Sequence, residues 1–320
     1  MTRTTSSAPR SNVGSATPDR IGFAFGILAY AAWGLLPIYF KLLQTIPPVS
    51  IVAHRICWSR IVLAMLLTVM RGWPTLRATL FDRRAMRLLA TSSALIAGNW
   101  LMYVWAVNNG HILAGSLGYY LNPLANILFG RFLLKEHLSR LQWAAVGIAA
   151  AGVAVLAVGA IDQLWISLLL CASFASYGFV RKIVSADALT GLAIETGLLF
   201  PFALGWLVAS HVPGAPAIAA TPHLALLLIA MGAISTAPLL LFTAAARRLP
   251  YSTMGMLQFI APTLQLLVAV FLYRERFTQA HAVAFAAIWT ALILYTSAMI
   301  SAARRDRLPS ARADAMLGEC

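Results

Sequence analysis

The chain has 320 residues, of which 60% are hydrophobic and only 11% are charged. Soluble domains carry about 25% charged residues, so this composition excludes an ordinary soluble protein. The net charge of +14 does not indicate nucleic-acid binding, because the basic residues flank apolar runs instead of forming one polar surface. We expect a protein that crosses a lipid bilayer several times, with the bilayer as its main partner and no nucleic-acid partner.

Residues 1–20 are rich in Ser, Thr, Pro and Arg and contain no apolar run. This pattern predicts a disordered cytoplasmic tail and not a cleavable signal peptide. Apolar segments follow that each approach the length of about 20 residues with which a helix crosses a bilayer. The ten predicted spans are residues 21–41, 50–70, 86–107, 112–132, 141–159, 163–181, 190–210, 224–246, 251–273 and 279–302, followed by a cytoplasmic C-terminal tail over 303–320.

The basic residues between these spans predict the orientation of the chain. If the N-terminus is cytoplasmic, most of the 24 Lys and Arg residues fall in inside segments, among them Arg181. Only Lys41, Arg274 and Arg276 then lie in outside segments. Cytoplasmic loops carry the excess of basic residues in membrane proteins. We therefore expect both termini in the cytoplasm and the spans in a bacterial-type plasma (inner) membrane.

The chain contains an internal duplication with an offset of 139 positions. Pro123 falls on Pro262 and Glu136 on Glu275 when the two copies are aligned. Because each copy has five predicted spans, an odd number, the second copy must be inverted relative to the first. The sequence therefore predicts an all-α membrane protein with one repeat over residues 21–159 and an inverted repeat over 163–302. Inverted repeats are the usual basis of alternating access in carriers.

The spacing Pro-x12-Glu at the end of the fourth and ninth spans resembles the EamA repeat of the drug/metabolite transporter (DMT) superfamily. Longer strings resemble the RarD branch, and the resemblance extends over about residues 20 to 300. They occupy residues 54–59, 99–100, 105–109, 116–124, 242–246 and 258–263. The resemblance implies an inner-membrane permease of ten transmembrane helices, built from two EamA repeats.

Polar side chains form a stripe along the fourth span. At about 100° per residue, Tyr119, Asn122 and Asn126 share one face, and Gln258 and Gln265 share the equivalent face of the ninth span. Buried amides must find partners in other helices or in a water-filled path. We expect Tyr119, Asn122 and Gln258 to line a solute site at the repeat interface, with bonding between helices as the alternative. For Asn126 and Gln265 we expect bonding between helices.

Prolines interrupt both of these spans. Pro123 and Pro262 lack an amide donor, so each frees a carbonyl one turn earlier in its helix. Two proline-broken helices at corresponding positions are typical of a midplane binding site between inverted repeats. We therefore predict a helix break at each proline.

Charged side chains within the spans are the sharpest functional candidates, because each costs about 2.5–3.5 kcal/mol on insertion scales. We expect Arg55 to bind an anionic or polar group of a solute, with its neighbour His54 beside it; the alternative is that Arg55 snorkels to the interface. Glu195 is the carboxylate of the other half, and Arg60 could pair with Glu195 or with a backbone carbonyl. His54 and Glu195 are also the candidate proton carriers, so protons are a candidate coupling ion.

Two further features could contribute to function. Trp100 beside Asn99 could stack on a planar solute, or the two could only pack in the core. Glu136 and Glu275 are predicted to cap helices or pair at the bilayer surface.

The leading hypothesis is a secondary transporter that moves a small metabolite or drug-like solute by alternating access. The sequence contains no phosphate-binding loop of the Gly-x4-Gly-Lys-Ser/Thr type and no His-Glu-x2-His or Gly-x-Ser-x-Gly motif. We therefore expect no enzyme activity, no catalytic residue, no metal site and no cofactor. The alternatives are an integral-membrane enzyme and a membrane sensor or scaffold without transport activity.

Overall fold

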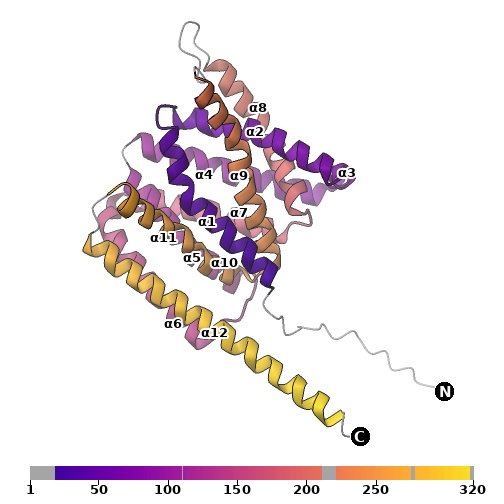
Figure 1. The fold of residues 1–320 in the computed structure, drawn as a ribbon, viewed down its shortest axis with the longest axis vertical. Coiled ribbons are helices and arrows are strands. Elements are labelled where there is room, and N and C mark those ends of the chain that lie inside the picture. Colours follow the sequence, from indigo (N-terminus) through magenta and orange to yellow (C-terminus); the bar gives the residue numbers. More distant parts are fainter. Residues whose placement is uncertain (1–18, 110, 211–220, 275–277, 318–320) are drawn as a thin grey trace, which may run out of the picture.

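The computed structural model describes residues 19–109, 111–210, 221–274 and 278–317, and these residues form helices and connections without a β-strand (Figure 1). The predicted all-α class is therefore confirmed. The first half contains α1 (Arg20–Leu42), α2 (Pro48–Val69), α3 (Trp73–Phe81), α4 (Arg83–Asn108), α5 (Ile112–Phe132) and α6 (Arg140–Ala157). The second contains η1 (Val158–Gln163), α7 (Leu164–Ile183), α8 (Ala188–Ala209), α9 (Pro222–Arg248), α10 (Tyr251–Gln258), α11 (Ile260–Leu267), η2 (Val268–Leu272) and α12 (Gln279–Leu317).

The predicted spans have helical counterparts throughout. Within the described residues, nine helical segments are long and apolar enough to cross a membrane. The helix α5, with 21 residues, occupies the place of the fourth predicted span and packs against α7 and α10. The nine-residue α3 was not predicted, and it is too short to cross a bilayer. Residues 1–18 of the predicted N-terminal tail lie outside the described residues.

Side-chain caps explain where several helices begin. The carboxylate of Asp19 accepts hydrogen bonds from the first amides of α1, and Asp187 caps α8 in the same way. At α6, the Ser139 hydroxyl accepts from the Gln142 amide at 3.3 Å, while the Gln142 side chain accepts from the Ser139 amide at 2.8 Å. Such caps satisfy amides that have no partner within the helix.

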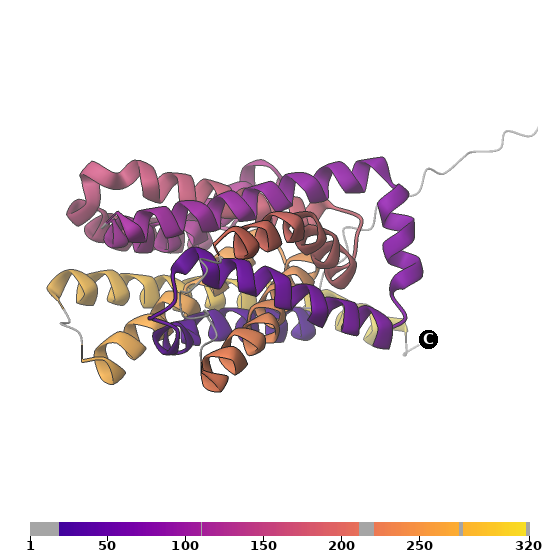
Figure 2. The same ribbon diagram turned by 90° about the horizontal axis from the view of Figure 1, so that it is seen from above.

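The packing of the helices follows an approximate two-fold relationship between the halves. The pair α1–α9 corresponds to α7–α4, and α2–α9 corresponds to α8–α4, and all four pairs are in contact. The helices α2, α5 and α6 pack on their own counterparts, α8, α10 and α12. The pair α6–α12 runs along one edge of the molecule (Figures 1 and 2).

The direction of the helices shows that the two halves are inverted. Near the start of α1, a Cβ added to Gly22 would lie 3.0 Å from the Cβ of Arg248 at the end of α9. Near the end of α7, the Lys182 ammonium donates to the carbonyl of Ala246 at 2.8 Å, also at the end of α9. The start of α1 and the end of its counterpart α7 therefore lie together. The predicted inversion is confirmed.

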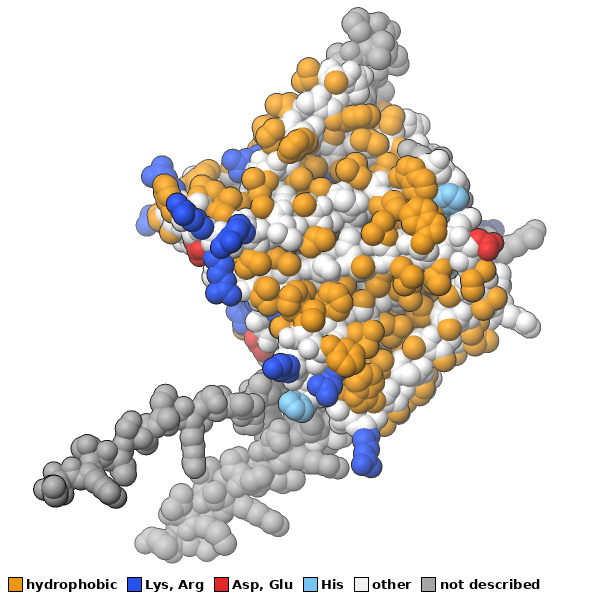
Figure 3. All heavy atoms as spheres, turned by 180° about the vertical axis from the view of Figure 1, so that it is seen from behind, with side chains coloured by type: hydrophobic (Ala, Val, Ile, Leu, Met, Phe, Trp, Pro, Cys, Tyr) orange, Lys and Arg blue, Asp and Glu red, His pale blue; other side chains and the backbone are white. Residues whose placement is uncertain are grey.

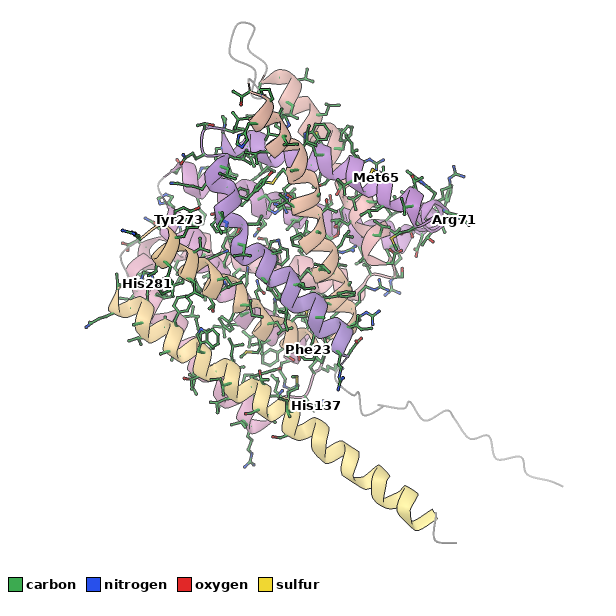
Figure 4. The ribbon with its side chains drawn as sticks, in the orientation of Figure 1. Phe23, Met65, Arg71, His137, Tyr273 and His281 are labelled. Carbon is green, nitrogen blue, oxygen red and sulfur yellow. The ribbon has the colours of Figure 1, made fainter. Side chains whose placement is uncertain are left out.

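The two ends of the helix bundle carry different chain segments. Phe23, Arg71 and His137 lie along one edge, and Tyr273 and His281 lie along the opposite edge (Figure 4). We call the end with Phe23, Arg71 and His137 the basic end, because Lys182 and Arg248 also lie there. The end with Tyr273 and His281 is called the opposite end. The segments that follow α5 and η2 thus leave the bundle at different ends, as inverted halves require.

The outer surface between these ends is apolar. Phe202 is 77% exposed, Phe132 67% and Met65 65%. Hydrophobic side chains cover most of the face in Figure 3, and Lys and Arg side chains gather along one side of it. An apolar surface of this extent is suited to lipid, since soluble monomers rarely expose contiguous apolar patches larger than a few hundred Å². The protein is a multi-pass membrane protein.

The two prolines behave differently in the two halves. The structure corrects the predicted break at Pro123, because α5 runs through this residue without interruption. A proline removes only one amide donor, and here α10 packs so closely that a Cβ on Gly255 would lie 2.5 Å from the Pro123 carbonyl oxygen. In the second half, the helix is divided at Phe259, and Pro262 is the third residue of α11.

Candidate functional site

A narrow cavity of about 20 Å³ lies between five helices of the bundle. Its wall includes Arg55 from α2, Trp100 from α4, Tyr177 from α7, Glu195 from α8 and Thr236 from α9. Both halves of the chain therefore contribute to it. We call this space the polar cavity.

Arg55 is held in the polar cavity by an aromatic ring. Its guanidinium carbon lies 4.1 Å from the centre of the Trp100 ring, a cation–π contact. Such contacts stabilise a cation by about 0.5–2 kcal/mol. No carboxylate of the described residues lies within ion-pair distance of Arg55. The stacked guanidinium thus keeps its hydrogen-bond donors for another partner.

Glu195 is paired with a residue that the sequence did not indicate. The Arg181 guanidinium lies 3.6 Å from Glu195 Oε1, and the two side chains are 0% and 2% exposed. The Ser92 hydroxyl donates a hydrogen bond to the same oxygen. Arg181, which the sequence places in an inside segment, is therefore buried in the bundle. The reason is that α7 continues to Ile183, so Arg181 lies in its last turn and points into the bundle.

The positions of these two residues along the chain gave no signal for this pair. Arg181 lies two residues before the end of α7 and Glu195 seven residues after the start of α8, and the long Arg181 side chain reaches α8 at Gly191. Arg181 also donates to the Ala188 carbonyl at 3.2 Å. Arg60 has another partner, because its guanidinium donates to the Ala193 carbonyl at 3.5 Å. Of the two predicted partners of Arg60, Glu195 and a backbone carbonyl, the structure shows the carbonyl.

One polar atom of the cavity wall, the Thr236 hydroxyl, has no hydrogen-bond partner among the described residues, whereas the Tyr177 hydroxyl interacts with Glu195 and Thr243. An unsatisfied buried polar group costs about 1–3 kcal/mol, so Thr236 favours a polar ligand or water in the cavity. Sequence reasoning missed Tyr177 and Thr236, since a single hydroxyl in an apolar run gives no signal of its own.

Two predicted site residues bond between helices outside the cavity wall. The Asn99 amide donates to the Leu170 carbonyl and to the Ser173 hydroxyl, both at 2.9 Å, and so joins α4 to α7. The Gln258 amide oxygen accepts from Asn126 at 2.6 Å and joins α10 to α5. Neither side chain is directed at the polar cavity by these bonds.

Three more predicted residues also lie outside the polar cavity's wall. The Tyr119 ring lies 5.5 Å from that of Tyr103, although Tyr119 is near enough to Arg55 for an electrostatic interaction. Asn122 is 1% exposed, and neither atom of its amide has a partner among the residues that the structure describes. His54 is half-buried on α2. The structure therefore brings together Arg55, Trp100 and Glu195 but not the whole predicted set.

A second, larger space adjoins the polar cavity. It holds about 200 Å³ between α2, α4 and α8, and its wall is almost wholly apolar. The two spaces share Ile56, Trp100 and Leu199. The side of this space away from the polar cavity faces the opposite end of the bundle, because it is lined by Phe202 and Trp206 from the last two turns of α8. We call this space the apolar groove.

The apolar groove separates two helices whose counterparts are tightly packed. The helices α4 and α8 meet near Ser93, whose hydroxyl donates to the Glu195 carbonyl at 3.1 Å, and then flank the groove at Leu101 and Ala203. The corresponding pair α9–α2 is closed, because a Cβ on Gly232 would lie 2.6 Å from the Trp58 backbone. Two interfaces related by the repeat therefore have different conformations in one structure.

The basic end is closed by contacts between the halves. Glu136, in the segment after α5, accepts hydrogen bonds from the amides of Tyr251 at 2.6 Å and Ser252 at 2.9 Å. It also accepts from the Ser252 hydroxyl at 2.6 Å. These bonds cap the N-terminus of α10, a helix of the second half. Glu275, the predicted counterpart of Glu136, lies outside the described residues.

Comparison with known proteins identifies the family. The profile of the EamA-like transporter family matches residues 20–158. An uncharacterized transporter of Pseudomonas aeruginosa is 46% identical over 87% of this chain and 93% of its own length. Protein RarD of Escherichia coli K12 is 42% identical over 91% of this chain and 98% of its own length. The chain belongs to the RarD branch of the EamA-like transporters.

The RarD relationship extends beyond these two bacteria. An uncharacterized transporter of Bacillus subtilis is 42% identical over 89% of this chain and 97% of its own length. One solved crystal structure superposes with a TM-score of 0.67 at 17% identity, covering 86% of this chain and 96% of that chain. That likeness supports the fold alone. The resemblance to the RarD branch of the DMT superfamily is confirmed, and the protein is a membrane transporter.

Proposed function

We propose that this chain is a secondary transporter of the plasma membrane, in which a small solute crosses by alternating access through the polar cavity. The main support is the difference between the two related interfaces. The pair α2–α9 is closed, whereas α4 and α8 are separated by the apolar groove. In an inverted-repeat carrier, the two related interfaces exchange conformations when the binding site turns from one side of the membrane to the other.

In this cycle the solute enters from the opposite end and reaches Arg55. The guanidinium on Trp100 binds an anionic or polar group, and the hydroxyl of Thr236 completes the hydrogen bonds. The helix α4 then packs along α8 in the way that α9 packs along α2. Release at the basic end requires the α2–α9 contact and the Glu136 cap to open. No step of this cycle changes the solute chemically, so the proposal is a transporter that is not an enzyme.

The proposed orientation places the basic end in the cytoplasm. Cytoplasmic segments carry the excess of Lys and Arg, and the residues at this end include Arg71, Lys182 and Arg248. Both termini are then cytoplasmic. The moving units are the two repeats, residues 21–159 and 163–302.

The proposed transport is tested by comparing the metabolites of cells with and without the protein. We expect at least one small solute to change its distribution between cells and medium without chemical conversion, and this change to be lost in Arg55→Ala. Arg84→Ala, at an exposed position at the start of α4, is the matched control. A sensor or scaffold would leave every solute where it was. A solute that moves equally with Arg55→Ala would show that the site is misplaced.

We also propose protons as the coupling ion, with Glu195 and His54 as the carriers. Glu195 is buried beside Arg181 and Ser92 and lies in the cavity wall. The test measures uptake into vesicles with and without a pH gradient for Glu195→Gln and His54→Ala. Gradient dependence that is unchanged in both variants would exclude this role.

A further inference from the structure

The charges around the polar cavity do not balance. Arg55 and Arg181 each carry a positive charge, and Glu195 is the one carboxylate in the cavity wall within the described part of the chain. Arg181 already lies 3.6 Å from Glu195, so the charge of Arg55 has no counter-ion there. An isolated charge at membrane depth is costly, and a bound anion would compensate it.

The apolar groove adjoins the part of the polar cavity that holds Arg55. Val49, Val52 and Arg55 follow one another along α2 from its start, so the groove lies between the opposite end and the guanidinium. Trp100 lines both the polar cavity and the apolar groove, and the Arg55 guanidinium stacks on its ring. The combined site thus has a cation at its inner end and about 200 Å³ of largely apolar space outside it.

We propose that the solute is an organic anion with a compact apolar group. Its anionic group binds Arg55, and its apolar group occupies the apolar groove against Phe202, Ala203 and Trp206. This inference rests on the proposed function and adds the chemical class of the substrate. The apolar groove is then the part of the site that selects among anions, because burying apolar surface adds to the affinity of those that fill it.

The order of charge and apolar surface argues against a membrane lipid as the resident of the groove. A phospholipid keeps its phosphate at the membrane surface and its acyl chains deeper. Here Arg55 lies deeper along α2 than three of the four α2 residues in the groove wall, and Ile56 is the fourth. The polarity of the site therefore fits a solute that enters with its anionic group first.

The proposal can be tested with the purified full-length protein and two carboxylates. Acetate and 4-phenylbutyrate share the anionic group, and only the second carries an apolar group large enough for the groove. Thermal unfolding is measured over a range of concentrations of each. We expect 4-phenylbutyrate to stabilise the protein at a concentration at least about tenfold lower than acetate, since burial of a phenyl group exceeds the 1.4 kcal/mol of a tenfold change.

Three variants separate the contributions. Ala97→Phe fills the groove without touching Arg55, and we expect it to abolish most of the difference between the two acids. Trp206→Ala serves the same purpose by removing groove surface, should Ala97→Phe fold poorly. Arg55→Gln should weaken both acids. Leu204→Phe, at a position of α8 outside both cavity walls and 44% exposed, is the control and should behave like the intact protein.

The possible results have distinct meanings. If both acids bind in an Arg55-dependent way but Ala97→Phe and Trp206→Ala preserve the difference, the groove is not the apolar subsite, and the proposed transport site stands. If neither acid stabilises the intact protein, the anion site and this inference both fail. If mass spectrometry finds a phospholipid that Ala97→Phe alone displaces, while the two acids bind the intact protein equally, the groove is a lipid site and the inference is overturned.

Discussion

Glu136 accepts a hydrogen bond of 2.6 Å from the backbone amide of Tyr251, so a carboxylate of the first half caps a helix of the second half. The amide and hydroxyl of Ser252 bind the same carboxylate. A Cβ on Gly130 would lie 2.6 Å from this carboxylate, so the end of α5 leaves room for it only because that position is glycine. The cap joins the halves at the basic end.

Removing the charge of Glu136 should loosen the basic end. Hydrogen bonds to a charged group are worth about 1.5–3 kcal/mol each, and Glu136→Gln weakens or removes three of them. In a background without the native cysteines, we expect a cysteine at Met254, which is fully buried, to react several-fold faster with a water-soluble maleimide. Lys135→Gln is the adjacent control. Equal rates for Glu136→Gln and the intact protein would contradict the cap as a closure.

The buried ion pair should show strong coupling between its two members. Arg181→Gln leaves the Glu195 carboxylate without its counter-ion in the bundle, which should cost about 3–5 kcal/mol of stability. The double variant with Glu195→Gln removes both charges and should recover much of this loss. A double-mutant cycle of the free energies of unfolding measures the coupling. Additive effects of the two substitutions would show that the pair does not act as a unit.

A methyl group at Gly191 should displace the Arg181 guanidinium. The added Cβ would lie 1.9 Å from an Arg181 nitrogen, and nothing lies within 4 Å of a Cβ at Gly205 on the same helix. We therefore expect Gly191→Ala to lower the unfolding temperature in the same direction as Arg181→Gln. Gly205→Ala should be neutral or slightly stabilising, because alanine is the better helix former. The reverse order of the two variants would show that Arg181 is placed differently.

Acid should weaken the link between Asp19 and Arg248. Two hydrogen bonds lower the pKa of the Asp19 carboxyl below its ordinary value of 3.8. The larger effect comes from the Gly22 amide, and the next from the Arg248 side chain at 3.0 Å. Because the folded pKa is the lower one, the stabilisation is complete above pH 3.8 and is lost as the pH falls through the folded value. The difference in unfolding temperature between the intact protein and Asp19→Asn should therefore vanish in acid.

Asp162→Asn, near the start of α7, is the control for the removal of one acidic side chain. Its unfolding temperature, compared with that of the intact protein, measures the general effect of removing one acidic side chain. A difference for Asp19→Asn that persisted at the lowest pH would show that the carboxylate charge is not what stabilises the start of α1.

The sequence predicts the helices well because each span is a long apolar run bounded by polar caps. The offset of 139 positions also predicts the inversion, which the contacts of Gly22 and Lys182 with the end of α9 confirm. In contrast, the sequence did not show that the helix continues unbroken through Pro123. Whether a proline breaks a helix depends on its neighbours, and α10 supports α5 closely at this point.

The candidate site is harder to predict, because a sequence gives the face of a side chain but not the helix opposite. Asn99 and Gln258 were predicted to line the site together with Arg55, yet their amides form hydrogen bonds to neighbouring helices. The burial of Arg181 could not be predicted, because a basic pair at the end of an apolar run is also typical of a cytoplasmic flank. Its side chain lies against Gly191 of α8 and within 3.6 Å of Glu195.

Lys182 holds the end of α9 through main-chain oxygens, those of Ala246 at 2.8 Å and Leu249 at 2.5 Å. Every amino acid offers the same carbonyl, so replacing the side chain at either acceptor leaves the bond intact. Of the three residues in this contact, only Lys182 supplies a side chain whose replacement removes the hydrogen bonds. Mutations that restore a protein lacking Lys182 should arise elsewhere in the bundle and not at positions 246 and 249.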